Sequence, residues 1–261
     1  MKCKIKNKKL VYKKIQFFVV AIIAIGMTSC SNIDNSKKFE QKTFQNNENN
    51  VIIKNESENN IPAKYKNVLE DAIFFSNTLE MSKAKVYDAL VQGKKFTAEE
   101  IQYAMDNIEV DWKENAIKVV KSYGGTKQYA MDYLSKVEMY EYLISESQMF
   151  TIEEAQYAVD NAGIDWETNA LGKVRLENND LLASESKIET YNHLILDGFT
   201  IEEAQYAVDN AGVDWKTNAL HAAEHHNMLH KFSLSKAEIY NYLTFNCKFT
   251  TEEAQYAIEE L

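Results

Sequence analysis

Phe199 to Ala219 reads FTIEEAQYAVDNAGVDWKTNA, and its first nine residues occur in three further close copies. The other copies begin at Phe96, Phe150 and Phe249. A unit that returns at a near-constant spacing is typical of repeat proteins, in which each unit packs on its neighbours. The chain is therefore expected to be an array of small repeated units.

Each repeated motif predicts the start of a helix. Thr97 with Glu100 forms a capping box, in which each side chain bonds the backbone N–H of the other residue. The same pairing recurs as Thr151 with Glu154, Thr200 with Glu203, Thr250 with Glu253, Ser135 with Glu138, Ser186 with Glu189 and Ser235 with Glu238. In the D-W-x-x-N-A motif, Asp111, Asp165 and Asp214 are expected to cap a further helix. Each unit is therefore predicted to hold three helices.

The fold class that follows is all-α: a tandem array of four small three-helix, helix-turn-helix-like repeats after a lipoprotein signal peptide and a disordered tether. With one Pro and 8 Gly, the chain has few of the turn residues that strand-rich folds need. The predicted segments are a signal peptide at 1–29, a tether at 30–61, and repeats at 62–110, 111–164, 165–213 and 214–261, the last one truncated.

The first 29 residues are typical of an export signal. Seven lysines and no acid precede an apolar run from Ile15 to Met27, which is shorter than an ordinary membrane span. The run ends at Thr28-Ser29-Cys30, which resembles a bacterial lipobox with Met27 in place of the usual Leu. Cys30 is therefore the predicted lipidation site, and acyl chains would hold the protein on the outer face of the cell membrane. The alternative is an uncleaved anchor.

Charge excludes one class of partner. Removal of the leader takes the formal net charge from -10 to -17, and an exported, acidic protein is not expected to bind nucleic acid. The Asn-rich segment that follows Cys30 buries too little apolar surface to order itself, so we expect a flexible tether. The body should attract a basic partner.

The lipobox together with the repeated F-T-x-E-E-A-x-Y-A-V-D-N…V-D-W-x-x-N-A resembles the Ltp family of host cell surface-exposed lipoproteins. This resemblance implies tandem three-helix units with helix-turn-helix geometry and a role in superinfection exclusion. It further implies that incoming phage DNA is blocked through a phage protein such as the tape-measure protein. No partner-binding residue of the family matches a motif here, so none is assigned from the resemblance.

A candidate partner face lies on the third helix of each unit. At 100° per residue, Ala98, Ile101, Ala104, Met105 and Ile108 share the expected core side. The opposite side repeats an acid, a tyrosine and a second acid: Glu99, Tyr103, Asp106; Glu153, Tyr157, Asp160; Glu202, Tyr206, Asp209; and Glu252, Tyr256, Glu259. Such a face would suit basic, partly apolar segments, because Tyr is a common interface anchor. Alternatively, each Tyr packs on the next long helix as a joint between units.

Trp112, Trp166 and Trp215 are interpreted as core plugs between units, with sugar stacking as the alternative. His221 and His225 are weak metal candidates because they are four residues apart on one helix. Aligned by the repeat, His225 and His230 replace leucines, which predicts semi-buried structural side chains instead. No motif of nucleophilic, phosphate-binding or metalloprotease catalysis is present, so neither an enzyme nor a cofactor is expected.

The sequence therefore predicts a membrane-anchored surface lipoprotein that binds another protein. The favoured role is superinfection exclusion by blocking phage DNA injection. The alternative is a host cell-surface or wall-associated interaction lipoprotein with no antiphage role. A metal-binding lipoprotein would be a third class.

Overall fold

The computed structural model describes residues 61–125, 133–178 and 184–261, and every regular element in these ranges is helical. The predicted all-α fold class is thus confirmed. The predicted signal peptide, Cys30 and nearly all of the tether lie outside the described residues.

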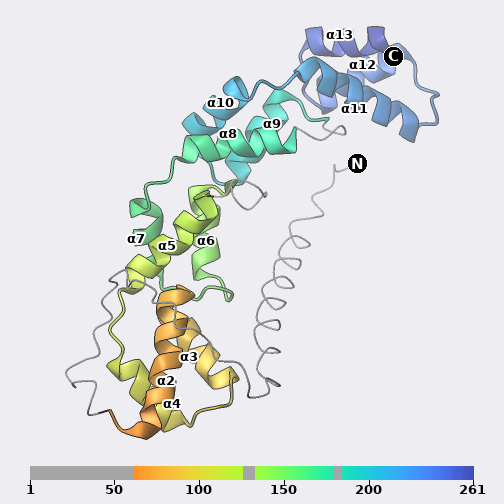
Figure 1. Ribbon diagram of the computed structural model, residues 1–261. Helices are drawn as coiled ribbons and strands as arrows, with labels where there is room; N and C mark the ends of the chain where they lie inside the picture. Colours follow the sequence, from red (N-terminus) through yellow and green to blue (C-terminus); the bar gives the residue numbers. More distant parts are fainter. Residues whose placement is uncertain (1–60, 126–132, 179–183) are drawn as a thin grey trace, which may run out of the picture. The chain divides into compact units, whose positions relative to one another are not determined.

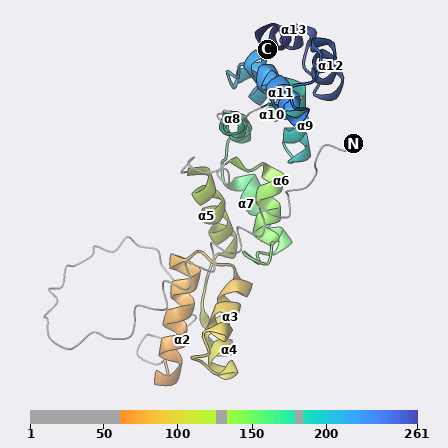
Figure 2. The same ribbon diagram turned by 90° about the vertical axis from the view of Figure 1, so that its right-hand side faces the viewer.

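The helices form four groups of three, which we call modules 1 to 4 (Figure 1, Figure 2). Module 1 holds α2 (Ala63–Ile73, continued by a π-helical turn at Phe74–Thr78), α3 (Lys83–Gln92) and α4 (Ala98–Asn107). Module 2 holds α5 (Trp112–Gly125), α6 (Lys136–Ile144) and α7 (Ile152–Asn161). Module 3 holds α8 (Trp166–Glu177), α9 (Lys187–Leu196) and α10 (Ile201–Asn210). Module 4 holds α11 (Trp215–Leu229), α12 (Lys236–Asn241, continued by a π-helical turn at Tyr242–Asn246) and α13 (Thr251–Glu260).

The helix starts follow the predicted caps. All seven predicted capping boxes are present, with both reciprocal bonds. In the remaining copy Ser82 accepts from the Lys85 backbone N–H but has no glutamate to complete the box. Asp165 and Asp214 cap α8 and α11, and Asp111 accepts from the Glu114 backbone N–H at the start of α5.

Each module has its own small core between the first and third helices. In module 1, Val68 and Ala72 of α2 meet Ile101, Ala104 and Met105 of α4. Ile108 is also buried, so four of the five residues predicted for this core face are confirmed. Ala98 is the exception: it lies in the first turn of α4 and is exposed.

Tryptophan joins one module to the next. Trp112, the first residue of α5, packs on the core of module 1, and Trp166 and Trp215 do the same on modules 2 and 3. This confirms their interpretation as plugs between units. A half-buried indole contributes a large apolar area, so each joint couples two small cores.

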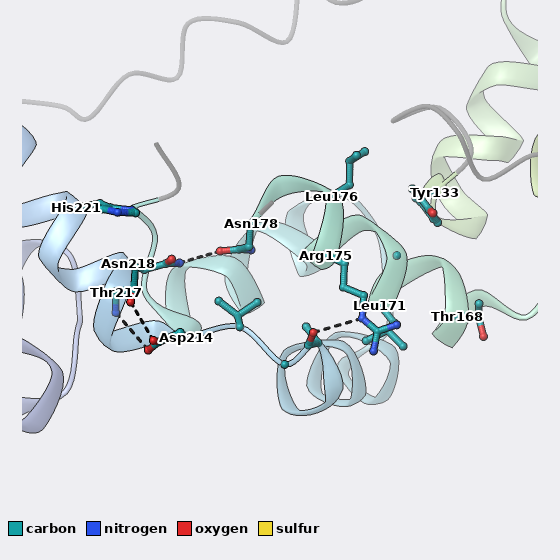
Figure 3. Close-up of a pocket in the computed structure, with 14 residues that line it drawn as sticks. Tyr133, Thr168, Leu171, Arg175, Leu176, Asn178, Asp214, Thr217, Asn218 and His221 are labelled. Atoms are coloured by element: carbon teal, nitrogen blue, oxygen red, sulfur yellow. Dashed lines mark hydrogen bonds between the residues drawn. The ribbon is translucent and has the colours of Figure 1, made fainter. Parts of the chain in front are cut away.

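An asparagine of the same motif completes each joint. The Nδ2 of Asn115 donates to the carbonyl oxygens of Ser76 (2.7 Å) and Met81 (3.1 Å) in module 1. Asn169 donates in the same way to Leu134 O at 3.0 Å. Asn218 donates to Glu185 O at 3.0 Å and to Asn178 Oδ1 at 2.8 Å, the second of which is drawn in Figure 3. In every joint the acceptor carbonyl includes the residue just before the capping serine of the second helix.

Candidate functional site

The third helices carry a glutamate and a tyrosine four residues apart, which we call the Glu–Tyr pair of each module. In module 2, Lys113 at the start of α5 reaches across to this pair on α7. Its Nζ lies 2.6 Å from Glu153 Oε1 and 5.1 Å from the centre of the Tyr157 ring. The hydrogen bond from Lys113 holds the pKa of Glu153 below its usual range. The module thus supplies its own ammonium group to its Glu–Tyr pair.

Module 4 repeats this arrangement. Lys216 Nζ lies 2.7 Å from Glu252 Oε1 and 6.0 Å from the Tyr256 ring centre. The lysine occupies the same position of the D-W-x-x-N-A motif as Lys113. Two modules therefore show how an ammonium group is held on this face, by a carboxylate and the face of an aromatic ring.

Module 1 covers its pair with a second aromatic ring. Tyr65 of α2 stacks on Tyr103, with ring centres 3.8 Å apart and an interplanar angle of 9°. The Tyr65 hydroxyl donates to Glu99 Oε1 at 2.7 Å, and Lys64 Nζ lies 2.9 Å from the same oxygen. These two hydrogen bonds lower the pKa of Glu99.

Module 3 differs at the position that supplies the cation. Glu167 replaces the lysine of modules 2 and 4. Within the described residues no ion pair, side-chain hydrogen bond or ring contact involves the side chains of Glu202 and Tyr206, and Tyr206 is 41 % exposed. The pair therefore offers a carboxylate and a ring face with no internal cation.

The second acid of the predicted face has another role. Asp160 pairs with Lys136 at 2.7 Å and Asp209 with Lys187 at 2.6 Å, which lowers the pKa of both carboxyls. Both lysines follow the capping serine of the second helix. The corresponding Asp106 and Glu259 accept from glutamine side chains one turn earlier. The second acid of each module is thus bonded to a side chain of the same module.

The joint between modules 3 and 4 contains a cavity of about 680 Å³ (Figure 3). Polar side chains that line it form hydrogen bonds with other residues of modules 3 and 4. Arg175 donates to the carbonyls of Asn210 and Ala211 at the C-terminal end of α10, and Asp214 accepts from Thr217. His221 also lines it. This cavity is part of the joint.

The histidines are arranged differently from the sequence prediction. His225 and His230 are exposed, so their predicted semi-burial is wrong. Leu176, the leucine that aligns with His225, is itself 39 % exposed, so its position did not indicate burial. His226 instead stacks on Tyr242, with ring centres 3.5 Å apart. In the described ranges no group of three or more His, Cys, Asp or Glu side chains is placed to hold a metal ion.

Sequence reasoning missed two features of this surface. It did not find the lysines of the Lys–Glu–Tyr contacts, although Lys113 and Lys216 share one motif position and Glu167 breaks it. It also assigned no role to the asparagines of the joints. The Asn-Ala pair that recurs in the D-W-x-x-N-A motif, in which both residues are buried, was a signal for the joint.

Among the described residues, no helix combines the length and the apolar character that a membrane span requires.

A family model described as host cell surface-exposed lipoprotein matches residues 63–108, 111–162 and 214–261. The chain belongs to this family. The three matched segments contain modules 1, 2 and 4. The description of the host cell surface-exposed lipoproteins names a location and a lipid modification, and both agree with the export signal and lipidation predicted for residues 1–30.

A solved structure to which the chain is similar is that of Ltp, a superinfection exclusion protein from the Streptococcus thermophilus temperate phage TP-J34. The identity is 30%, and the match covers 36% of this chain and 94% of that chain with a TM-score of 0.33. None of the curated proteins compared with the chain matches it.

Proposed function

We propose that this lipoprotein is held on the outer face of the cell membrane by lipid on Cys30 and blocks injection of phage DNA by binding a phage protein. It acts as a binding protein without catalysis or cofactor. Its membership of the host cell surface-exposed lipoproteins and its export signal support the location. The superinfection exclusion associated with the repeat motif supports the role.

We place the binding site at the Glu–Tyr pair of module 3, because this pair has no lysine of its own module. In modules 2 and 4 the same pair holds a lysine of its own module at 2.6 and 2.7 Å. At module 3 a lysine or arginine of the partner takes that place, against Glu202 and the ring of Tyr206, with Glu167 as a second carboxylate. We therefore expect the partner segment to be basic, and a phage tape-measure protein is the candidate partner.

Charge also favours module 3. Residues 165–213 contain ten acidic and three basic side chains, against nine and five in 111–164 and seven and four in 214–261. A concentrated acidic surface speeds encounter with a basic partner, and the effect weakens as salt screens it.

The test is a plaque assay on cells that express the chain or Glu167→Lys. This substitution installs the lysine of modules 2 and 4, which should occupy the Glu–Tyr pair of module 3 from within. We expect normal phage adsorption and blocked DNA entry with the original chain, and restored DNA entry with the variant. Glu224→Lys, an exposed change of equal charge in module 4, is the matched control and should still exclude phage.

Two outcomes count against the proposal. Exclusion by Glu167→Lys as strong as that of the original chain would remove module 3 as the binding site. Unchanged plaquing across a broad phage panel with the original chain would favour the alternative, a host cell-surface or wall-associated interaction protein with no antiphage role.

A further inference from the structure

A cavity of about 550 Å³ lies beside the Lys–Glu–Tyr contact of module 2, where the start of α5 faces the start of α7. Three of the described residues that line it are acids, Asp111, Glu153 and Glu154, and the cation among them is Lys113. The charge that this cavity presents to the outside therefore depends on where the Lys113 ammonium group lies.

Two of the three carboxylates are held in place by helix caps. Asp111 accepts from a backbone N–H in the first turn of α5 at 3.1 Å, and Glu154 accepts from the backbone N–H just before α7 at 2.9 Å. The third carboxylate, Glu153, holds the Lys113 Nζ at 2.6 Å. A cation that enters the cavity thus meets acceptors that are already positioned, which spares the cost of ordering them.

The contact that now fills this site is exposed to solvent. The Lys113 side chain is 40 % exposed, and that of Glu153 is 80 % exposed. Exposed ion pairs add little stability, because water screens the charges and two long side chains lose freedom. A cation from outside can therefore take the place of Lys113 at a small cost.

Modules 2 and 3 share an exposed apolar side chain at this surface. Ile152 and Ile201 are the first residues of α7 and α10, one position before the glutamate of each Glu–Tyr pair, and they are 70 % and 65 % exposed. Modules 1 and 4 have Ala98 and Thr251 at this position. Modules 2 and 3 therefore both suit a basic residue that has an apolar neighbour.

We propose that module 2 is a second site for the basic partner segment, and that Lys113 closes it until a lysine or arginine of the partner displaces this side chain from Glu153 and Tyr157. The inference rests on the proposed function, because it takes the Glu–Tyr pair of module 3 as the open form of the same site. Module 1 stays closed, since Tyr65 stacks on Tyr103 with ring centres 3.8 Å apart. Two sites strengthen binding when one partner reaches both.

The experiment titrates the full chain with the dipeptide acetyl-Leu-Arg-amide, which carries one guanidinium group, one apolar side chain and no acid. The tyrosine rings of the chain carry ¹³C, and Tyr157→Phe and Tyr206→Phe assign the two NMR resonances that matter. In the original chain the Tyr206 resonance should shift at the lower peptide concentration. The midpoint for Tyr157 should be up to about fivefold higher, the factor by which an exposed ion pair competes.

One variant opens the site, and a matched variant controls for charge. Lys113→Met removes the ammonium group and keeps most of the length of the side chain, so the Tyr157 midpoint should fall to within about twofold of that for Tyr206. Lys121→Met makes the same change of charge at an exposed position of α5 and should leave the Tyr157 midpoint unchanged. An equal fall in both variants would overturn the proposal, because it would show a general effect of charge.

The two tyrosines separate this inference from the proposed function. A Tyr157 midpoint that Lys113→Met does not lower, together with a response at Tyr206, would overturn the second site and leave module 3 as the binding site. A response at Tyr157 in Lys113→Met with none at Tyr206 would keep module 2 and remove module 3. No saturable response at either ring would overturn both.

Discussion

Gly198 lies in a turn at which module 3 closely approaches module 2. Its φ of +91° lies in the left-handed region, and a Cβ added there would come within 2.7 Å of Val137 Cβ in module 2. Gly163 after α7 has a similar φ of +71° but open space around it. Gly163→Ala should therefore cost about 1 kcal/mol, from backbone strain alone.

Gly198→Ala should cost clearly more than Gly163→Ala, since the same strain is joined by the overlap with Val137. Urea unfolding of the two variants and the original chain measures the free energies. An equal loss of unfolding free energy in both variants would show that the backbone shifts to accommodate the added methyl group beside Val137.

At this scale the sequence predicts caps well and cross-helix contacts poorly. A capping box lies within four residues, so Thr151 and Glu154 could be paired by inspection. The contact between Lys113 and Glu153 joins residues forty positions apart and depends on how α5 and α7 align. Met149 and Lys248 adopt positive φ at the turn position where module 3 has Gly198, so the absence of glycine did not change the turn.

Two capping boxes of the second helices should respond to acid in opposite ways. The bonds from Ser235 lower the pKa of Glu238 from 4.5, whereas burial raises the pKa of Glu189 from the same value. A lowered pKa gives stability that is present above pH 4.5 and is lost as pH falls through the folded value. A raised pKa does the reverse, so the charge on Glu189 costs stability until it takes up a proton.

Glu238→Gln should therefore destabilise the chain at neutral pH, and this loss should shrink as the pH falls below 4.5. Glu189→Gln should cost less at neutral pH, and its cost should grow on acidification. Urea unfolding of each variant beside the original chain at several pH values tests this. Parallel pH dependence for the two variants would contradict the difference in burial between α9 and α12.

Most of the elements were predictable because every described α-helix except α2 begins at a capping serine, threonine or aspartate. The sequence did not predict which side chains of the same module contact the exposed face of each third helix. The predicted partner face on α4, α7, α10 and α13 stays a prediction, and its second acids on α7 and α10 are paired within their modules. The sequence shows Glu167 at the position of Lys113 and Lys216, but only the folded copies show that these lysines reach the Glu–Tyr pairs.

In the whole molecule, the joints decide whether the modules unfold together. A repeat array behaves as a line of units coupled to nearest neighbours. Trp166 links modules 2 and 3, so Trp166→Ala should remove about 2 kcal/mol of coupling, roughly half of the usual cost for a fully buried indole. We expect one unfolding transition to split into two.

Hydrogen exchange under native conditions can measure the unfolding of each module residue by residue. In Trp166→Ala, amides of α5 to α7 and those of α8 to α10 should show different opening free energies. Trp112→Ala is the matched variant, and in it module 1 should unfold independently of module 2. A single cooperative transition in both variants would show that the asparagine bonds alone couple the modules.

The proposed function makes the location of the molecule depend on lipid at the sulfur atom of Cys30. Each buried CH₂ of an acyl chain contributes about 0.8 kcal/mol, so diacylglycerol on Cys30 would outweigh the repulsion between an acidic body and anionic lipid. Cys30→Ser should therefore move the protein out of the membrane fraction, end labelling by radioactive palmitate, and abolish exclusion in the plaque assay. The folded modules should remain intact, as judged by circular dichroism. Membrane retention of Cys30→Ser would instead identify the apolar run from Ile15 to Met27 as an uncleaved anchor.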